Sequence, residues 1–158
     1  MRKVVRISRK TAGVLILFYF VLLLYWMFIG FGRAHNVYFQ QHMYNLTPFH
    51  TIKQYIFNSG SYNTRTWVIN LFGNIGVFIP FGICIPYVFN WRAAKFMIAF
   101  ITGIAVLELT QMLSRRGSFD IDDIILNTLG AFAGYLIFII LKNISGKPTD
   151  WNKVSRQA

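Results

Sequence analysis

The chain has 158 residues and a formal net charge of +11, and hydrophobic side chains make up 55% of it. This composition is more apolar than that of an ordinary soluble domain, so it excludes most classes of soluble protein, and the length allows one domain. The single cysteine, Cys84, excludes a disulfide framework and a thiolate metal cluster. The composition therefore predicts one integral membrane domain.

Four apolar segments are long enough to cross the roughly 30 Å hydrocarbon core of a bilayer. In chain order they are residues 13–31, 67–89, 95–113 and 121–141. The first follows a basic N-terminus, as the apolar region of a signal peptide would. However, its nineteen uncharged residues exceed the usual length of about 7 to 15, and no small-residue cleavage pattern follows. We therefore predict an all-α polytopic membrane protein, a single domain over residues 1–158 built as a bundle of four transmembrane helices.

Two of the predicted spans contain residues that alter helix geometry or packing. Pro80 lies inside the second span and removes a helical hydrogen bond, so we expect a kink or break near it. Gly130 and Gly134 in the fourth span have the four-residue spacing of the small-residue motif that brings transmembrane helices together.

The distribution of basic residues predicts the orientation in the membrane. Eleven of the sixteen lysines and arginines lie in the N-terminal segment, in the connection around residues 92–95, or after residue 141. The other five lie in the long connection 32–66 and in the turn 114–120. Because Lys and Arg beside spans are retained in the cytoplasm, both termini are predicted to be cytoplasmic and the latter two connections external. The same distribution argues against nucleic-acid binding, since the positive charge follows the flanks of the spans.

The connection 32–66 is rich in aromatic residues, which favour the headgroup region of a membrane. We predict a short interfacial helix near residues 47–57, with Thr47 as the N-cap and Pro48 as the first helical residue. The connection also contains all three histidines of the chain, His35, His42 and His50. Their spacing matches no zinc signature, so the sequence predicts no metal and no cofactor.

Polar residues gather near the predicted outer ends of three spans. Four of the five acidic residues fall within residues 107–123. At 1.5 Å per helical residue, the polar side chains of the three spans lie within about 10 Å of the outer surface. Their spacing places each set on one helix face, so we predict an extracytoplasmic polar pocket. The candidate ligand-binding residues are Asn70, Asn74, Glu108, Gln111, Arg116, Asp120, Asp123 and Asn127.

Charged residues inside a membrane usually find partners, and we expect Arg115 and Arg116 to act as counter-ions for these carboxylates. A purely structural interpretation also stands. Aspartates at a helix start can cap it, long charged side chains near a helix end can reach water, and asparagines can join helices.

Several short motifs in order resemble those of the VanZ-like family of bacterial membrane proteins. They are NLTPF (45–49), NLFGN (70–74), FIPFG (78–82), ELTQ (108–111), DIDD (120–123) and NTLG (127–130). The resemblance covers about residues 45–141. The naming member of that family is associated with low-level teicoplanin resistance, so the resemblance implies a membrane fold and a link to the cell envelope. It implies no particular reaction.

Two functions fit these observations. In the first, the pocket binds an envelope amphiphile such as a lipid headgroup, a cell-wall precursor or a lipoglycopeptide, and the protein contributes to glycopeptide resistance. In the second, the protein is an enzyme acting on lipid-linked substrates at the outer leaflet. Glu108, Asp120 and Asp123 would then serve as general acid or base, with or without a divalent cation. DIDD lacks the glycine and glutamate of a calcium loop, so we favour binding.

Overall fold

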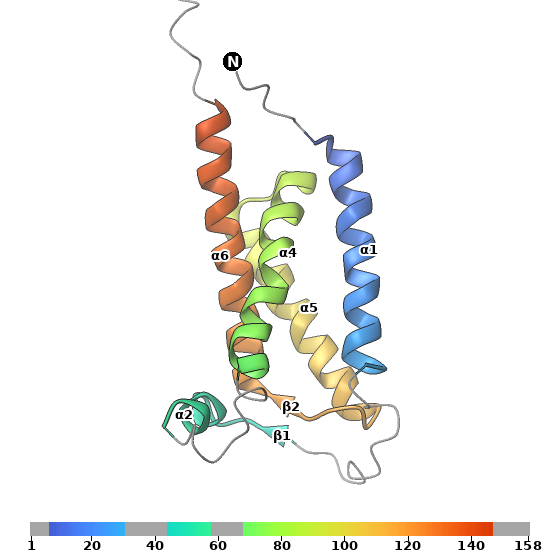
Figure 1. Ribbon diagram of the computed structural model, residues 1–158, viewed down its shortest axis with the longest axis vertical. Helices are drawn as coiled ribbons and strands as arrows, with labels where there is room; N and C mark the ends of the chain where they lie inside the picture. The colour runs from blue at the N-terminus through green and yellow to red at the C-terminus, as the bar shows by residue number, and fades with distance from the viewer. Residues whose placement is uncertain (1–6, 31–43, 58–67, 147–158) are drawn as a thin grey trace, which may run out of the picture.

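A computed structural model describes residues 7–30, 44–57 and 68–146. Within these ranges, four helices are long and apolar enough to cross a membrane, which confirms the predicted all-α membrane fold (Figure 1). Three of them are α1 (Arg9–Phe28), α5 (Ala93–Leu113) and α6 (Ile121–Gly146). The fourth is the helical span Asn70–Phe89, which contains α4 (Asn74–Phe89). Two of the three histidines, His35 and His42, lie outside the described residues.

The first helix begins four residues earlier than the apolar run alone predicts. The hydroxyl of Ser8 accepts a hydrogen bond from the amide of Thr11 at 3.0 Å, which satisfies one of the free amides of the first turn. The polar residues Arg9 and Lys10 therefore belong to the helix, although they carry charge.

The second predicted span is irregular at a different place from the one expected. Helix α4 continues through Pro80 and Pro86 without a break, so the prediction of a break at Pro80 is wrong. Instead, the turn before it, η3 (Ile69–Gly73), is a π-helix. Such wide turns are rare and are frequently found at functional sites, and this one carries Asn70.

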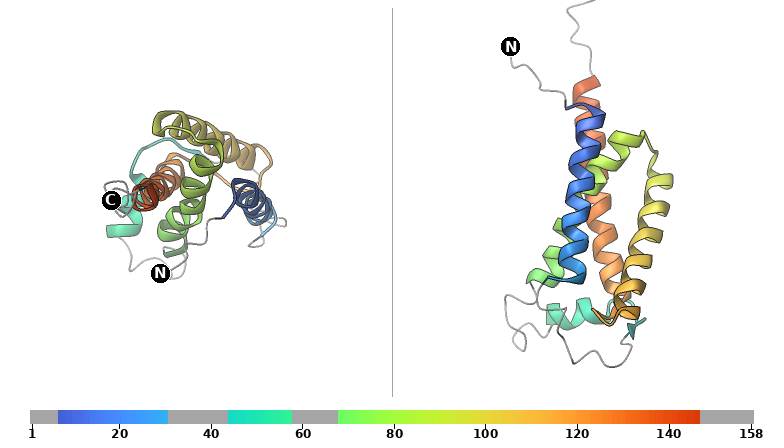
Figure 2. Two further views of the ribbon diagram at one scale, coloured as in Figure 1. Left: turned by 90° about the horizontal axis from the view of Figure 1, so that it is seen from above. Right: turned by 90° about the vertical axis from the view of Figure 1, so that its right-hand side faces the viewer.

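Helices α4 and α6 run in the same direction and form the closest pair in the bundle (Figures 1 and 2). A methyl group added at Gly130 would collide with the carbonyl oxygen of Ile75, and one added at Gly134 with that of Ile79. Gly82 faces the backbone of α6 in the same way. The predicted glycine motif therefore does bring two helix backbones together.

The other two helices flank this pair. Helix α1 packs chiefly against α4, where the Tyr19 hydroxyl donates to the carbonyl of Val77 at 2.9 Å. Helix α5 packs chiefly against α6, where the rings of Phe96 and Tyr135 stack with centroids 5.9 Å apart. Aromatic side chains therefore contribute to the contacts of both flanking helices.

One end of the bundle carries the α5–α6 connection and a small covering layer, which together we call the hairpin end (Figure 1). The layer consists of α2 (His50–Phe57) and strand β1 (Tyr44–Asn45), which pairs in parallel with β2 (Phe119–Asp120). The start of α1 and the end of α6 lie at the opposite end (Figure 1). The even number of spans thus brings the two described ends of the chain to one side.

The predicted short helix exists, but it begins at His50 and not at Pro48. Asn45 Oδ1 accepts the Thr47 amide at 3.1 Å, and Phe49 adopts a positive φ of 62°. Residues 47–49 therefore form a turn that precedes the helix. The cap comes from elsewhere in the chain.

Candidate functional site

The cap of α2 is the carboxylate of Asp122, which is fully buried in the first turn of α6. Its Oδ1 accepts the amide of Phe49 at 2.6 Å, and its Oδ2 accepts the amide of Ile52 at 3.1 Å. These are the amides of the cap position and of the third helical residue, the pair that a capping box normally satisfies with two side chains. One carboxylate performs both tasks and fixes α2 to the bundle.

Asp122 was not among the residues predicted to form the site. It lies off the helix face shared by Asp120, Asp123 and Asn127, and its partners are 70 and 73 residues away in the chain. Its position in the first turn of α6, between Asp120 and Asp123, was the only indication in the sequence, and it favours a cap for α6 itself. In the structure the side chain caps α2.

Asp120 joins the two strands of the hairpin end. Its Oδ2 accepts the hydroxyl of Thr51 at 2.6 Å, and its Oδ1 accepts the amide nitrogen of Asn45 at 3.2 Å. Oδ1 also accepts the backbone amide of Asp122 at 2.9 Å. This predicted ligand-binding residue is therefore held in place by three donors.

Asp123 lies on the side of α6 that faces α4. Its Oδ1 accepts the side-chain amide of Asn74 at 2.7 Å, so two of the predicted site residues meet directly. One turn earlier, Asn70 on the π-helix donates to the hydroxyl of Tyr55 in α2 at 3.0 Å. Elements far apart in sequence thus converge at the hairpin end.

Gln111 and Arg116 connect α5 to the end of α1. The Gln111 amide donates to the carbonyl of Met27 at 2.8 Å, and the Arg116 guanidinium donates to that of Phe28 at 2.7 Å. Both carbonyls belong to the last turn of α1, where helical partners are missing. Arg116 was expected to pair with a carboxylate, but its hydrogen bond goes to a carbonyl at the end of α1.

Arg115 is exposed and has a different role from its neighbour. Its φ of 57° lies in the left-handed region, and its amide donates to the carbonyl of Met112 at 3.0 Å. The next amide, that of Arg116, donates to Gln111 at 2.9 Å. This is the Schellman pattern of a helix C-terminus, usually built with glycine at the left-handed position. Arg115 therefore ends α5.

A small cavity of about 190 Å³ opens among these residues at the hairpin end. Four of the eight predicted site residues line it: Asn70, Gln111, Asp120 and Asp123. The remaining lining residues are Thr51, Tyr55, Gly117 and Ser118. The cavity therefore draws on α2, η3, α5, the α5–α6 connection and both ends of the Asp120–Asp123 motif.

The other four predicted residues do not line this cavity. Glu108 and Asn127 are buried, with only 4% and 2% of their surfaces exposed. Asn74 holds the cavity residue Asp123 through a hydrogen bond, and Arg116 donates a hydrogen bond to the last turn of α1. In the described part of the chain, the Oδ1 atom of Asn127 and the hydroxyl of Thr128 are buried without a hydrogen-bond partner.

Among residues 7–30, 44–57 and 68–146, no three His, Cys, Asp or Glu side chains are grouped as ligands. The cavity instead offers carboxylate and amide oxygens and hydroxyl groups. Such groups suit directed hydrogen bonds to a polar ligand.

A family model described as VanZ/LLP1 matches residues 16–142. The match spans most of all four long helices and therefore includes the first one, which the sequence motifs did not cover. No curated protein and no solved structure matches the chain. With four apolar helices and a family match over most of its length, the chain is a multi-pass membrane protein of the VanZ/LLP1 family.

Proposed function

We propose that the protein binds the polar headgroup of an envelope amphiphile in the cavity at the hairpin end, on the extracytoplasmic side of the membrane. The observation that carries this proposal is the cavity itself. Its lining of amide, hydroxyl and carboxylate groups stands at the end of an otherwise apolar bundle. Polar groups at this depth are costly unless they are partnered, so a polar site maintained there supports a binding role.

The chemistry of the lining favours a ligand that donates hydrogen bonds. Asp120 and Asp123 bring carboxylates, which accept hydrogen bonds and attract positive charge. An ammonium group or a set of sugar hydroxyls matches them, so the sugar part of a lipid-linked precursor would enter the cavity while its anionic phosphate linkage stays outside it. The ligand class is therefore an amine-bearing or sugar-bearing lipid, as cell-wall precursors are.

The size of the cavity supports a headgroup fragment over a complete antibiotic. Pockets for drug-sized ligands measure about 300–1,000 Å³, and this one measures about 190 Å³. A lipoglycopeptide would exceed it several times. A contribution to teicoplanin resistance would then act through the precursor or lipid that the antibiotic also encounters.

The surrounding hydrogen bonds support a preorganised site. Asp122 fixes α2, which supplies Thr51 and Tyr55 to the lining. Gln111 is fixed by the end of α1. Because the lining side chains are already oriented, a ligand pays little additional ordering entropy when it binds.

The test uses purified protein in nanodiscs with a labelled lipid-linked disaccharide precursor of the cell wall. We expect saturable binding by the parent and a loss of about tenfold in affinity for Asp123→Asn or Asn70→Ala, since each removes one directed interaction. Asn143→Ala is the matched control, because Asn143 is exposed on α6 near the opposite end. Unchanged binding in both site variants would overturn the proposal.

The same samples test the enzymatic alternative. Product formation from the labelled precursor by the parent, lost in Glu108→Gln or Asp123→Asn, would replace binding by catalysis. Binding without turnover supports the proposed function. Teicoplanin is titrated separately, and tighter binding of teicoplanin than of the precursor would contradict the inferred ligand class.

A further inference from the structure

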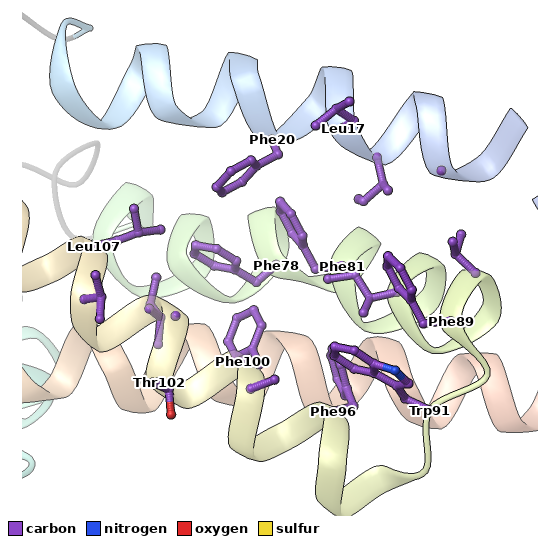
Figure 3. A pocket seen from close by; sticks show the side chains of 18 residues that line it. Leu17, Phe20, Phe78, Phe81, Phe89, Trp91, Phe96, Phe100, Thr102 and Leu107 are labelled. Carbon is purple, nitrogen blue, oxygen red and sulfur yellow. The ribbon is translucent and has the colours of Figure 1, made fainter. Parts of the chain in front are cut away.

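A second cavity, much larger than the first, lies between α1, α4 and α5. Its volume is about 730 Å³ and its lining is almost entirely apolar. The rings of Phe20, Phe78, Phe81 and Phe100 point into this space from all three helices (Figure 3). We call it the aromatic groove.

The shape of the bundle explains why the groove exists. At the hairpin end α1 and α5 are joined, since Gln111 donates to the carbonyl of Met27. Toward the opposite end α5 leans toward α6 while α1 stays on α4 (Figure 1). The two helices therefore diverge, and the space between them widens away from the hairpin end.

The groove has the length of one leaflet. Its lining on α5 runs from Phe96 to Leu107, and the eleven steps between these residues cover about 16 Å at 1.5 Å per residue. Half of a hydrocarbon core of about 30 Å is about 15 Å. An acyl chain of a lipid in the leaflet opposite the hairpin end therefore matches the groove in length and in polarity.

A transmembrane helix matches it less well. A helix is a rigid cylinder about 10 Å across, whereas flexible acyl chains can follow the uneven aromatic walls. A second copy of the chain is the alternative occupant, and the experiment below distinguishes it from lipid.

Positive charge surrounds the wide end of the groove. Trp91 lines the groove, and the ammonium group of Lys95 lies 4.9 Å from the centre of its ring. Arg92 stands beside Trp91, and Arg9 and Lys10 lie one turn before the lining residue Gly13. All four cations are exposed. We call them the basic cluster.

The charge is not balanced by acids within the described part of the chain. All four described acidic residues lie between residues 108 and 123, toward the hairpin end. In addition, α5 starts at this mouth with no side-chain cap from Arg92 and no acid in its first turn. Its free amides and positive dipole end therefore face the same region.

We propose that the aromatic groove and the basic cluster form a binding site for an anionic phospholipid. The acyl chain lies along the groove, and the phosphate lies at Arg9, Lys10, Arg92 and Lys95. Basic pockets between transmembrane helices hold anionic headgroups by the same combination of charge and chain contact. This site is separate from the headgroup cavity at the hairpin end and does not depend on the function proposed for it.

The chain offers a matched pair of glycines for the test. At both Gly103 and Gly76 an added Cβ atom meets no atom within 4 Å, but only Gly103 lines the groove. Gly103→Leu therefore fills the groove, while Gly76→Leu makes the same helical substitution outside it. The headgroup site is tested with the double variant Arg92→Gln/Lys95→Gln. Its control is Arg115→Gln/Lys53→Gln, which removes two exposed cations of the hairpin end.

Native mass spectrometry of the purified protein follows titration with phosphatidylglycerol or with phosphatidylcholine of equal chain length. We expect the parent to retain one phosphatidylglycerol and to prefer it by about tenfold. Gly103→Leu should weaken binding of both lipids by about tenfold, and Gly76→Leu should not. The Arg92→Gln/Lys95→Gln protein should lose the preference for phosphatidylglycerol, and the hairpin-end pair should keep it.

Three results would overturn the inference. They are equal retention of the two lipids by the parent, parent-like binding by Gly103→Leu, or a dimer that Gly103→Leu disrupts. The last result would assign the groove to a second copy of the chain. If Gly103→Leu does not yield folded protein, the Arg92→Gln/Lys95→Gln protein tests the proposal alone. An unchanged preference of that protein for phosphatidylglycerol would contradict the headgroup site.

Discussion

The amide of Phe49 donates to the Asp122 carboxylate across 2.6 Å, joining the segment before α2 to the first turn of α6. Together with the bond from Ile52, it makes one buried acid the anchor of the whole layer at the hairpin end. The layer in turn supplies Thr51 and Tyr55 to the polar cavity.

We expect Asp122→Ala to release α2 from the bundle while the four long helices remain. Hydrogen bonds to a charged group contribute about 1.5–3 kcal/mol each, so the loss should be about 3 kcal/mol or more. Hydrogen exchange of residues 49–57 measures it directly. Asp122→Asn, which keeps one acceptor oxygen, should fall between parent and alanine variant. Exchange that stays slow in Asp122→Ala would contradict the anchor role.

The bond between Asn74 and Asp123 should appear as an energetic coupling between α4 and α6. Polar pairs in membrane proteins couple by about 0.6 kcal/mol on average and up to about 1.7 kcal/mol. At a distance of 2.7 Å with a carboxylate acceptor, we expect a value near the upper end, about 1.5 kcal/mol. A double-mutant cycle of Asn74→Ala and Asp123→Ala in unfolding measurements gives it. Additive effects would mean that the pair contributes no mutual stabilisation.

Glycines in the bundle should differ sharply in their tolerance of alanine. At Gly130 and Gly134 the new methyl group meets backbone oxygens of α4, which cannot move aside singly. We expect each alanine variant to lose about 3 kcal/mol, the upper range for overpacking. Gly103→Ala is the control, since it meets open space and gains helix propensity of up to about 1 kcal/mol. Thermal unfolding in detergent distinguishes them, and equal midpoints would refute the backbone contact.

The two adjacent arginines should respond in opposite directions. Arg116→Ala removes the donor to the carbonyl of Phe28 and should destabilise the protein by about 2 kcal/mol. Arg115→Gly relieves a left-handed backbone conformation that costs a non-glycine residue about 1–2 kcal/mol. It should therefore raise the unfolding midpoint. Should Arg115→Gly lower the midpoint, a side-chain contact of Arg115 must outweigh the strain.

Orientation in the membrane is a separate prediction from the charge distribution. In a Cys84→Ala background, Ser114→Cys should react with an impermeant maleimide added outside intact cells. Lys95→Cys should react only after the membrane is opened. Both positions are exposed, so accessibility within the fold does not limit the reaction. The reverse pattern would place the polar cavity on the cytoplasmic side.

The sequence was sufficient for the four helices because a bilayer demands long apolar segments, and hydropathy reports these directly. It also predicted that polar residues of three spans lie near one another, since helical rise is constant, and Asn70, Gln111 and Asp123 line one cavity. Contacts between distant segments could not be predicted in this way. The pairing of β1 with β2 involves two residues in each strand, too few to leave a pattern.

The roles of single side chains were harder still. Asp122 and Asp123 are neighbours of the same type, yet one is wholly buried under α2 and the other borders the cavity. Arg116 was expected to neutralise an acid and is bonded to a carbonyl. Which partner a polar side chain finds depends on tertiary contacts, and no local spacing encodes these.

The glycine contact makes α4 and α6 a fixed central pair, and α1 and α5 pack on the outside of it. At Gly82, Gly130 and Gly134 the backbones of α4 and α6 meet directly, with no side chain between them that could repack. Helices α1 and α5 each lean chiefly on one member of that pair and are tied to each other by Gln111 at the hairpin end. If α1 and α5 moved apart, they would rotate about the hydrogen bond between Gln111 and Met27. Such a movement would leave the central pair and the polar cavity at the hairpin end undisturbed.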